Sequence, residues 1–544
     1  MDLILALHSH LPYVLHHGRW PHGSDWLCEA ALDTYLPLLE ALRALEREGV
    51  PAPITIGFTP VLANQLASPD FAAELEAFIA QRLKACAEAP ASLAASGDSH
   101  LKPLAEFWRA RFTRLRDLFR ALDGGLLPAF RALEEAGRIE IIGSAATHGY
   151  LPLLGRPESI ALQLGLGAAE HRRYFGRAPR GCWLPECAYR PGLERQLARA
   201  GFSYFFTDAH LAVAGPALGT NVDAPLGAER FDAERTGKAG EPSAPALRTP
   251  YTAYRVSAAG AVPVFALVRD PRSSAQVWSR HEGYPGDEWY LDFHKIRQPG
   301  GLKYWRVSGH GVDMGDKRPY EPGQAQGRVL SHGTHFARHL ANTPCGPRGE
   351  VAQVAVAPFD TELFGHWWFE GVDFLAELYR QVRGQPGVHP CTAEAHLESH
   401  PNPPGLRLAE GSWGANGDDS MWLNEKTRWT WERLHPLEDA FWGVAASALA
   451  RDEARPVLAQ AARSLLLAQA SDWQFIISTG AVADYAERRF RLHCDDADRL
   501  VAALRPGTRA DALARAREDA NVIGGRDTVF PDILAAVAAA LAVP

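Results

Sequence analysis

The sequence has few cysteines and no pattern that would use them together. Seven are scattered over 544 residues, and no two form a CxxC pair. An odd, scattered set predicts neither a disulfide framework nor a cysteine-based zinc site. We therefore expect a protein of a reducing cytoplasm without a cysteine-bound metal, and we expect no cofactor.

The sequence also lacks an excess of positive charge and long apolar runs. The net charge is -8, and no Lys/Arg block stands out. This excludes the usual electrostatic footprint of a nucleic-acid or membrane-surface protein. No apolar run reaches the roughly 20 residues of a membrane span, and the first residues, MDLILALHSHLPYV, are too short and too acidic to predict an export signal. No GxGxxG or GxxxxGK[ST] follows the first apolar run, so nucleotide binding has little support.

Short apolar runs alternate with longer helix-period segments. The expected helices include residues 36–48 and 107–136, and the expected strands are residues 3–10, 52–58, 138–149, 180–186, 202–208, 262–270 and 351–360. Continuous apolar runs separated by helices are typical of a parallel sheet that is buried on both faces. The pattern indicates an α/β fold, either a barrel-like (β/α) domain or an open doubly wound sheet.

Six of the seven apolar runs end in polar or charged residues. The strand-end groups are His8 and His10, Ser144 with His148, Glu186, Asp208, Arg269 with Asp270, and Asp360. In a barrel of parallel strands, the carboxyl ends of the strands and the loops after them form the active-site face. The repeated placement therefore favours a barrel with one functional face.

The domain organisation changes near residue 400. Residues 1–400 carry the alternation, interrupted by a Gly/Pro/Ala-rich stretch at 211–250, expected as a mobile surface loop, and by 271–335, expected as elaborated loops over the barrel mouth. Residues 401–544 begin with a linker-like HPNPPGLRL and become helical, with amphipathic patterns over 436–450, 456–476 and 482–504. We expect an all-helical C-terminal domain that contributes to the active-site cleft.

Two acids at strand ends suggest the chemistry. Glu186 follows Pro185 in GCWLPECAYRPG, and Asp360 ends the run VAVAPFD, with aromatic residues beside both. A single strand-end Glu most often points into water, since Glu is almost never buried unpaired. A pair of such carboxylates is what glycosyl transfer needs, with one attacking the sugar and the other protonating the leaving oxygen.

Tryptophans and histidines add to this interpretation. Fifteen Trp is a high count, and Trp278, Trp413 and Trp422 fall in expected loops, where an exposed indole can stack on a sugar ring; core packing is the alternative for each. The pair His8 and His10 places two imidazoles on one strand face. They either hydrogen-bond sugar hydroxyls or form half of a zinc site, for which no further ligand stands at a recognisable spacing.

Five long motifs resemble glycoside hydrolase family 57, in the family's order. They are HSHLPYV (8–14), EIIGSAATHGYLPLL (140–154), WLPECAY (183–189), APFDTELFGHWWFEG (357–371) and WGANGDDSMWLNEKTRWTWERLH (413–435). The resemblance covers residues 1 to about 475. It implies a distorted (β/α)7 barrel with inserted loops and helices, followed by a helical domain, and a retaining mechanism without a metal.

The resemblance also implies roles for individual residues. Glu186 would be the nucleophile and Asp360 the general acid/base, whereas Glu362 matches the family pattern only loosely and is not assigned. The expected substrate-binding residues are His8, His10, His148, Trp183, Arg269, Trp278, Trp413, Trp422, Asp472 and Trp473. Trp183 and its neighbours would keep water from the nucleophile.

The implied activity is that of a 1,4-alpha-glucan branching enzyme, which cleaves α-1,4 linkages and transfers the chain to a 6-hydroxyl. The expected partner is an α-1,4-glucan such as amylose. An α-amylase or 4-α-glucanotransferase is the alternative within the family; a metal-dependent carbohydrate hydrolase using His8 and His10, and an inactive glucan-binding protein, are the alternatives outside it. The loop that carries a closing Tyr in branching members has no Tyr here between Phe231 and Tyr251, which predicts a larger share of hydrolysis.

Overall fold

The computed structural model describes residues 1–122, 125–213, 248–258, 260–279, 283–343 and 352–542. The expected 211–250 loop lies almost entirely outside these residues, and with it the stretch without Tyr that contains Phe231. In the described part of the chain, no helix is both long and apolar enough to cross a membrane.

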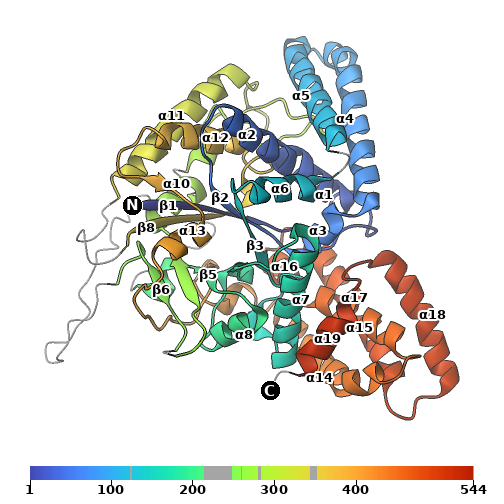
Figure 1. Ribbon diagram of the computed structural model, residues 1–544. Coiled ribbons are helices and arrows are strands. Elements are labelled where there is room, and N and C mark those ends of the chain that lie inside the picture. Colours follow the sequence, from blue (N-terminus) through green and yellow to red (C-terminus); the bar gives the residue numbers. More distant parts are fainter. Residues whose placement is uncertain (123–124, 214–247, 259, 280–282, 344–351, 543–544) are drawn as a thin grey trace, which may run out of the picture.

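A curled sheet forms the centre of the molecule (Figure 1). Its hydrogen-bonded order is β6-β7-β5-β4-β3-β2-β1-β8, and all neighbours except β6 and β7 are parallel. The strands are β1 (Asp2–Ser9), β2 (Ile54–Phe58), β3 (Glu140–Ser144), β4 (Gly181–Trp183), β5 (Tyr204–Thr207), β6 (Ala253–Arg255), β7 (Phe265–Val268), β8 (Val354–Asp360) and β9 (His389–Pro390).

The sheet closes at the seam between β7 and β8. The only strand contact there is a parallel bridge from Arg269, just after β7, to Val356, supported by the Asp270 N–H bond of 2.7 Å to the Val356 carbonyl within the described residues. The antiparallel strand β6 pairs with β7 at this seam, and just before β6 the Tyr251 carbonyl accepts a bond of 3.0 Å from the Val354 N–H at the start of β8. The result is a distorted barrel of seven parallel strands, β1 to β5, β7 and β8, which confirms the predicted fold class and all seven expected strands.

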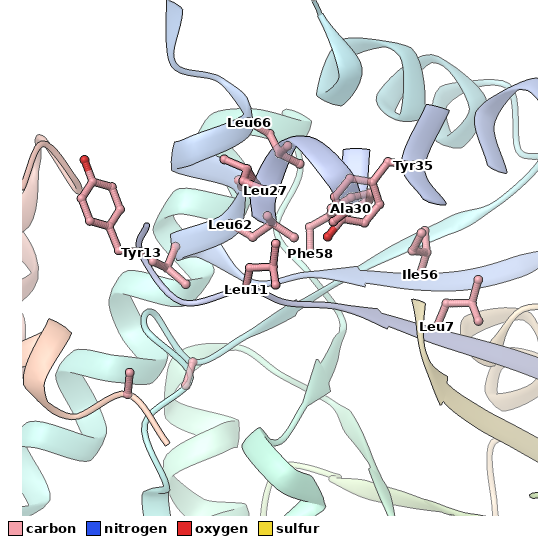
Figure 2. Close-up of a cluster of buried hydrophobic side chains, with 14 of the residues drawn as sticks. Leu7, Leu11, Tyr13, Leu27, Ala30, Tyr35, Ile56, Phe58, Leu62 and Leu66 are labelled. Carbon is pink, nitrogen blue, oxygen red and sulfur yellow. The ribbon is translucent and has the colours of Figure 1, made fainter. Parts of the chain in front are cut away.

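Side-chain alternation along the strands separates the interior of the barrel from the helix-covered exterior. On β1, Leu3, Leu5 and Leu7 belong to the large outer core, whereas Ile4 and Ala6 belong to a smaller cluster with side chains of β3, β4, β5, β7 and β8. Figure 2 shows part of the outer core, where side chains of β1 and β2 meet those of the neighbouring helices. Since the period along a strand is two, His8 continues the interior face of Ile4 and Ala6.

Helices cover the outside of the barrel. The expected helix at 36–48 is present, and the expected helix at 107–136 is two helices, α5 and α6. The helices up to residue 400 are α1 (Ser24–Ala30), α2 (Leu36–Arg47), α3 (Pro60–Leu66), α4 (Pro69–Ala95), α5 (Lys102–Ala121), α6 (Leu126–Glu135), α7 (Pro157–Phe175), α8 (Leu193–Ala200), α9 (Ala209–Ala212), α10 (Pro271–Trp278), α11 (Pro322–Ala341), α12 (Gly371–Val382) and α13 (Ala393–Ser399). The 271–335 region therefore contains α10 and the first part of α11 as well as the expected loops.

The chain beyond residue 427 is helical, as expected. Its helices are α14 (Arg428–Leu449), α15 (Arg455–Ala468), α16 (Asp472–Thr479), α17 (Ala483–Leu504), α18 (Ala510–Arg526) and α19 (Ile533–Leu541). The stretch before them lies on the barrel, because Gly405 bridges Arg255 and Gly411 bridges Tyr189. A domain boundary near residue 400 stays a prediction.

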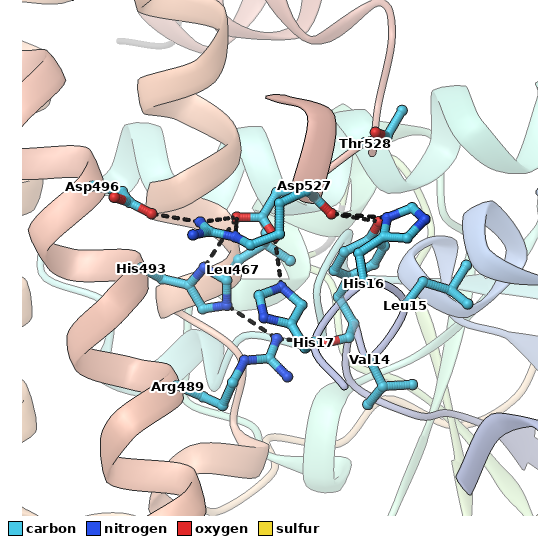
Figure 3. Close-up of polar contacts among 12 residues, drawn as sticks. Val14, Leu15, His16, His17, Leu467, Arg489, His493, Asp496, Asp527 and Thr528 are labelled. Carbon is cyan, nitrogen blue, oxygen red and sulfur yellow. Dashed lines mark hydrogen bonds and ion pairs between the residues drawn. The ribbon is translucent and has the colours of Figure 1, made fainter. Parts of the chain in front are cut away.

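A buried polar cluster joins the loop after β1 to these helices (Figure 3). The carboxylate of Asp527 accepts a bond of 2.7 Å from Nε2 of His17 and one of 2.7 Å from Arg526. Nη2 of Arg489 donates to the Tyr13 carbonyl at 2.6 Å and lies 3.2 Å from Nε2 of His493. The loop that follows His8 and His10 is thereby fixed against α17 and α18.

Candidate active site

Glu186 stands on a strained turn directly after β4. Its φ is +59° and that of Cys187 is +48°, a left-handed conformation that residues with a Cβ rarely adopt. Strain of this kind is concentrated at functional sites, where the surrounding structure holds it. Pro185 restricts the backbone before the turn, so the direction of the carboxylate is fixed by the chain itself.

Both oxygens of Glu186 are held by groups from outside the barrel strands. The indole Nε1 of Trp413 donates to Oε2 at 3.0 Å, and the hydroxyl of Ser471 donates to Oε1 at 2.9 Å. Burial and the negative charge of Asp472 raise the pKa of Glu186, whereas the two hydrogen bonds and His10 oppose that rise. Bonds to the ionised form favour a carboxylate, which is the form a nucleophile requires.

Asp360 ends β8 and is paired in register with His8 on β1. Burial, together with the charges of Glu362 and Glu186, raises the pKa of Asp360 well above its ordinary value, and Arg269 opposes this only in part. No hydrogen bond of the kind that holds Glu186 counteracts the rise among the described residues. Two carboxyl groups whose environments favour different protonation states supply an acid and a nucleophile.

His8 and His148 form a neutral pair beside the acids. Their Nε2 atoms are 2.9 Å apart, and the His8 ring stacks on Trp183 with centroids at 4.7 Å. Burial lowers the pKa of both histidines well below the ordinary value, and the charge of His10 adds to this. Both ring nitrogens of His148 are occupied, since its Nδ1 lies 3.0 Å from the Ser471 hydroxyl, whereas Nδ1 of His8 has no partner among the described residues and can bind a sugar hydroxyl.

His10 differs from its two neighbours in charge. Its Nε2 lies 3.0 Å from Oδ2 of Asp472, the first residue of α16, and its Nδ1 lies 3.0 Å from the Thr59 hydroxyl. Burial lowers the pKa of His10, but the charge of Asp472, its hydrogen bond and the charges of Glu186 and Glu362 raise it on balance. The helical region thus supplies the counter-ion of an active-site imidazolium.

Glu362 is a third buried acid of the site, and the sequence did not identify it. It accepts bonds from the His10 backbone N–H at 3.2 Å and from the Tyr35 hydroxyl, and burial raises its pKa to about 7. Ser471 was missed as well, although it contacts both Glu186 and His148. The usable signals were a second acid two residues after Asp360 and the position of Ser471 beside the predicted Asp472.

The predicted aromatic residues divide into two groups. Trp183, Trp413 and Trp278 follow one another, with ring centroids 5.4 Å and 6.4 Å apart, and Trp278 is the one with a partly exposed face. Trp422 is buried against Tyr150 at 4.5 Å. Trp183 and Trp422 therefore support the site from behind and do not present a ring to a sugar.

Two further predicted substrate contacts, Trp473 and Arg269, are buried among protein partners. Trp473 is fully buried, and its Nε1 donates to the Leu467 carbonyl at 2.8 Å while its ring lies under the Arg489 guanidinium, so it is a core residue of the helical region. Arg269 is buried in an ion pair of 2.9 Å with Asp208. Its charge acts on Asp360 from within the protein.

The fold brings together three side chains that could bind a metal ion near the acids. Ligand atoms of His10, His148 and Asp472 all lie within 4.8 Å of one another. Each of these side chains also has protein partners, since the two ring nitrogens of His148 contact His8 and Ser471. Binding of a cation here would therefore require at least one of these nitrogens to give up its protein partner.

Comparison with known proteins places the chain in a family. The model of glycosyl hydrolase family 57 matches residues 4–294, and a 1,4-alpha-glucan branching enzyme of Thermococcus kodakarensis is 39% identical over 519 residues, which are 92% of this chain and 73% of that protein. This chain belongs to glycosyl hydrolase family 57. A second family model, described as the C-terminal region of 1,4-alpha-glucan branching enzyme, matches residues 433–537.

Other proteins resemble the chain over nearly its whole length. A probable 1,4-alpha-glucan branching enzyme of Mycobacterium tuberculosis is 34% identical and covers 96% of this chain and 95% of its own. The crystal structure of a family 57-type branching enzyme from Pyrococcus horikoshii superposes with a TM-score of 0.85 at 36% identity, covering 98% and 96%. An α-amylase from Thermotoga maritima gives 0.79 at 29% identity, covering 99% of both chains.

Proposed function

We propose that this chain is a 1,4-alpha-glucan branching enzyme that works by a retaining double displacement. The observation that carries the proposal is the pair of acids in opposite settings, Glu186 held by two donors and Asp360 beside the charges of Glu362 and Glu186. The relatives named as branching enzymes, and the match of residues 433–537 to the C-terminal region of such enzymes, support branching as the outcome.

In the first step, Glu186 attacks C1 of an α-1,4-linked glucose. The bond from C1 to the leaving oxygen breaks as Asp360 protonates that oxygen, and a β-linked glycosyl-enzyme ester remains. His8, His10 and His148 lie beside Glu186 and hold hydroxyls of the donor glucose. The partly exposed ring of Trp278 and the edge of Trp413 contact sugar rings along the glucan.

In the second step, the 6-hydroxyl of an acceptor chain attacks C1. Asp360, now a carboxylate, takes the hydroxyl proton, the ester bond breaks, and Glu186 regains its charge as an α-1,6 linkage forms. A water molecule in place of the acceptor gives hydrolysis by the same route. The ratio of the two outcomes depends on how well the site excludes water.

An α-amylase is the second candidate, and one observation favours it: the full-length similarity to the Thermotoga maritima α-amylase. The absence of Tyr between Phe231 and Tyr251 points the same way, toward hydrolysis alongside transfer. We also keep the cytoplasm as the proposed compartment, because the six cysteines of the described residues are all unpaired.

Incubation with amylose distinguishes these candidates. New reducing ends measure hydrolysis, and branch points released by isoamylase measure transfer, both followed in one time course with Glu186→Gln as the inactive control. We expect branch points together with a substantial share of new reducing ends. Reducing ends without any branch points would identify an α-amylase, and a large excess of branch points over reducing ends would show that the missing Tyr has no effect.

A further inference from the structure

A group of metal-ligand side chains lies at the opposite end of the barrel from the acids. Asp2 begins β1, Cys391 follows β9, and His396 is on α13, beside the amino end of β1 (Figure 1). Their ligand atoms all lie within 4.8 Å of one another. Asp2 and His8 are six positions apart on β1, about 20 Å of extended strand, so this group is distinct from the active site.

The backbone holds these side chains together. β9 pairs with β1, with Asp2 opposite His389, and the Cys391 N–H donates to the Leu3 carbonyl at 2.9 Å. The His396 ring approaches from α13, where its Nδ1 lies 2.7 Å from Oδ2 of Asp2. Three segments far apart in the sequence therefore present a carboxylate, a thiol and an imidazole to one point.

His400 supplies a fourth group one helical turn after His396. Its Nδ1 lies 4.0 Å from Oδ2 of Asp2, and the two imidazole centroids are 4.7 Å apart. Nδ1 of His400 also bonds to the His396 carbonyl at 3.0 Å, so the His400 ring would have to turn about its side-chain bonds to bring a nitrogen lone pair to the ion.

The ligand atoms of these four side chains favour one kind of metal ion. A thiolate, two imidazoles and one carboxylate make a mixed S, N and O set, which suits tetrahedral zinc and does not suit calcium or magnesium, whose ligands are oxygens. An ion pair that only attached α13 to β1 would need Asp2 and His396 but no thiol. A pocket lined in part by Thr252, His396 and His400 gives an ion access from solvent.

We propose that Asp2, Cys391, His396 and His400 form a structural zinc site. The ion would link the first strand, β9 and α13 at the amino end of the barrel and would take no part in glycosyl transfer. The sequence contains the spacing Cys391-x4-His396-x3-His400, but the fourth ligand comes from the other end of the chain, so the spacing alone does not reveal the site.

The test uses untagged, metal-stripped protein titrated with Co²⁺, because a histidine tag would itself bind the ion. We expect one equivalent to bind with a thiolate-to-cobalt charge-transfer band in the near ultraviolet. Cys391→Ser should remove the band, and Cys86→Ala, which deletes a buried thiol on α4, should keep it. The His10, His148 and Asp472 group contains no thiol and cannot produce this band. Absence of the band in the native sequence, or its persistence in Cys391→Ser, would overturn the proposal.

A second variant guards against loss of folding. The His400 side chain is 40% exposed, so His400→Gln should fold normally by circular dichroism and bind Co²⁺ at least tenfold more weakly. Zinc should raise the Tm of the native sequence but not that of Cys391→Ser. Equal Co²⁺ affinity in His400→Gln would overturn the four-ligand site, and an unchanged Tm on adding zinc would overturn its structural role.

Discussion

The indole nitrogen of Trp413 donates a hydrogen bond of 3.0 Å to Oε2 of Glu186, across 227 residues of sequence. The backbone N–H of Trp413 also donates to the Glu186 carbonyl, at 3.1 Å. One residue of the segment that crosses the barrel mouth therefore fixes both the backbone and the carboxylate of the candidate nucleophile. Ser471 holds the other oxygen from the start of the α16 region.

Trp413→Phe keeps an aromatic ring and removes the donor, so it should raise the pKa of Glu186 further. The acidic limb of the pH profile of kcat/KM should then move to higher pH, since a larger share of Glu186 is protonated. A hydrogen bond to a charged group contributes about 1.5–3 kcal/mol, so activity at the optimum should fall roughly 10- to 100-fold. Trp278→Phe is the matched control, because Nε1 of Trp278 has no hydrogen-bond partner among the described residues; its acidic limb should stay in place. An unmoved limb in Trp413→Phe would contradict this role.

Glu362→Gln should shift the alkaline limb of the pH profile of kcat/KM. The charge of Glu362 raises the pKa of Asp360, so removing that charge lowers it and moves the alkaline limb of the profile to lower pH. Tyr35→Phe should produce a smaller shift in the same direction. The Tyr35 hydrogen bond lowers the pKa of Glu362, whose value is about 7, and its loss leaves more of Glu362 neutral. If both variants kept the native alkaline limb, Asp360 would not be the acid of the reaction.

Asp527→Asn should destabilise the fold. The carboxylate is fully buried and its pKa lies below the ordinary 3.8: burial alone would raise it, but the His17 bond, the charge of His493 and the Arg526 bond lower it. A depressed pKa contributes stability that is present above about pH 4 and is lost as the pH falls toward the folded-state value. Breaking a buried pair costs about 3–5 kcal/mol, which urea unfolding at pH 7 measures. Glu518→Gln, an exposed change on α18, should alter stability by less than about 0.5 kcal/mol. The two variants should become similar at low pH, and equal stability at pH 7 would contradict the role of the cluster.

The seven strands and the helical stretches named from the sequence could be predicted because their signals are local. Continuous apolar runs identify strands buried on both faces, and strand-end polar residues identify the functional face. The closure by a single bridge between Arg269 and Val356 could not be predicted, since it depends on how far the sheet curls. The break between α5 and α6 was missed although the sequence carries a helix-stop signal there, the pair Gly124 and Gly125.

The site was predictable where the chemistry lies on a strand end and not where it depends on burial. Glu186, Asp360, His8 and His10 meet as expected, and Asp472 reaches them from α16. In the sequence, Trp473 cannot be distinguished from an exposed tryptophan that stacks on a sugar ring. Only the packing of α16 on α17 shows that it is buried. The signals of Ser471 and Glu362 were only their positions beside Asp472 and Asp360, which decide little because hydroxyl and carboxyl groups are common at helix starts and turns.

The role of each acid is tested most directly by the anomeric configuration of the azide product. With an activated α-maltooligosyl substrate and azide, Glu186→Ala should regain activity and release a β-glycosyl azide, because azide takes the place of the nucleophile on that face. Asp360→Ala should release an α-glycosyl azide, because azide then attacks the glycosyl-enzyme that Glu186 has formed. A β product from Glu186→Ala and an α product from Asp360→Ala are the results predicted here. The reverse pattern, or near-native activity of either variant without azide, would contradict the assignment of Glu186 as nucleophile and Asp360 as acid.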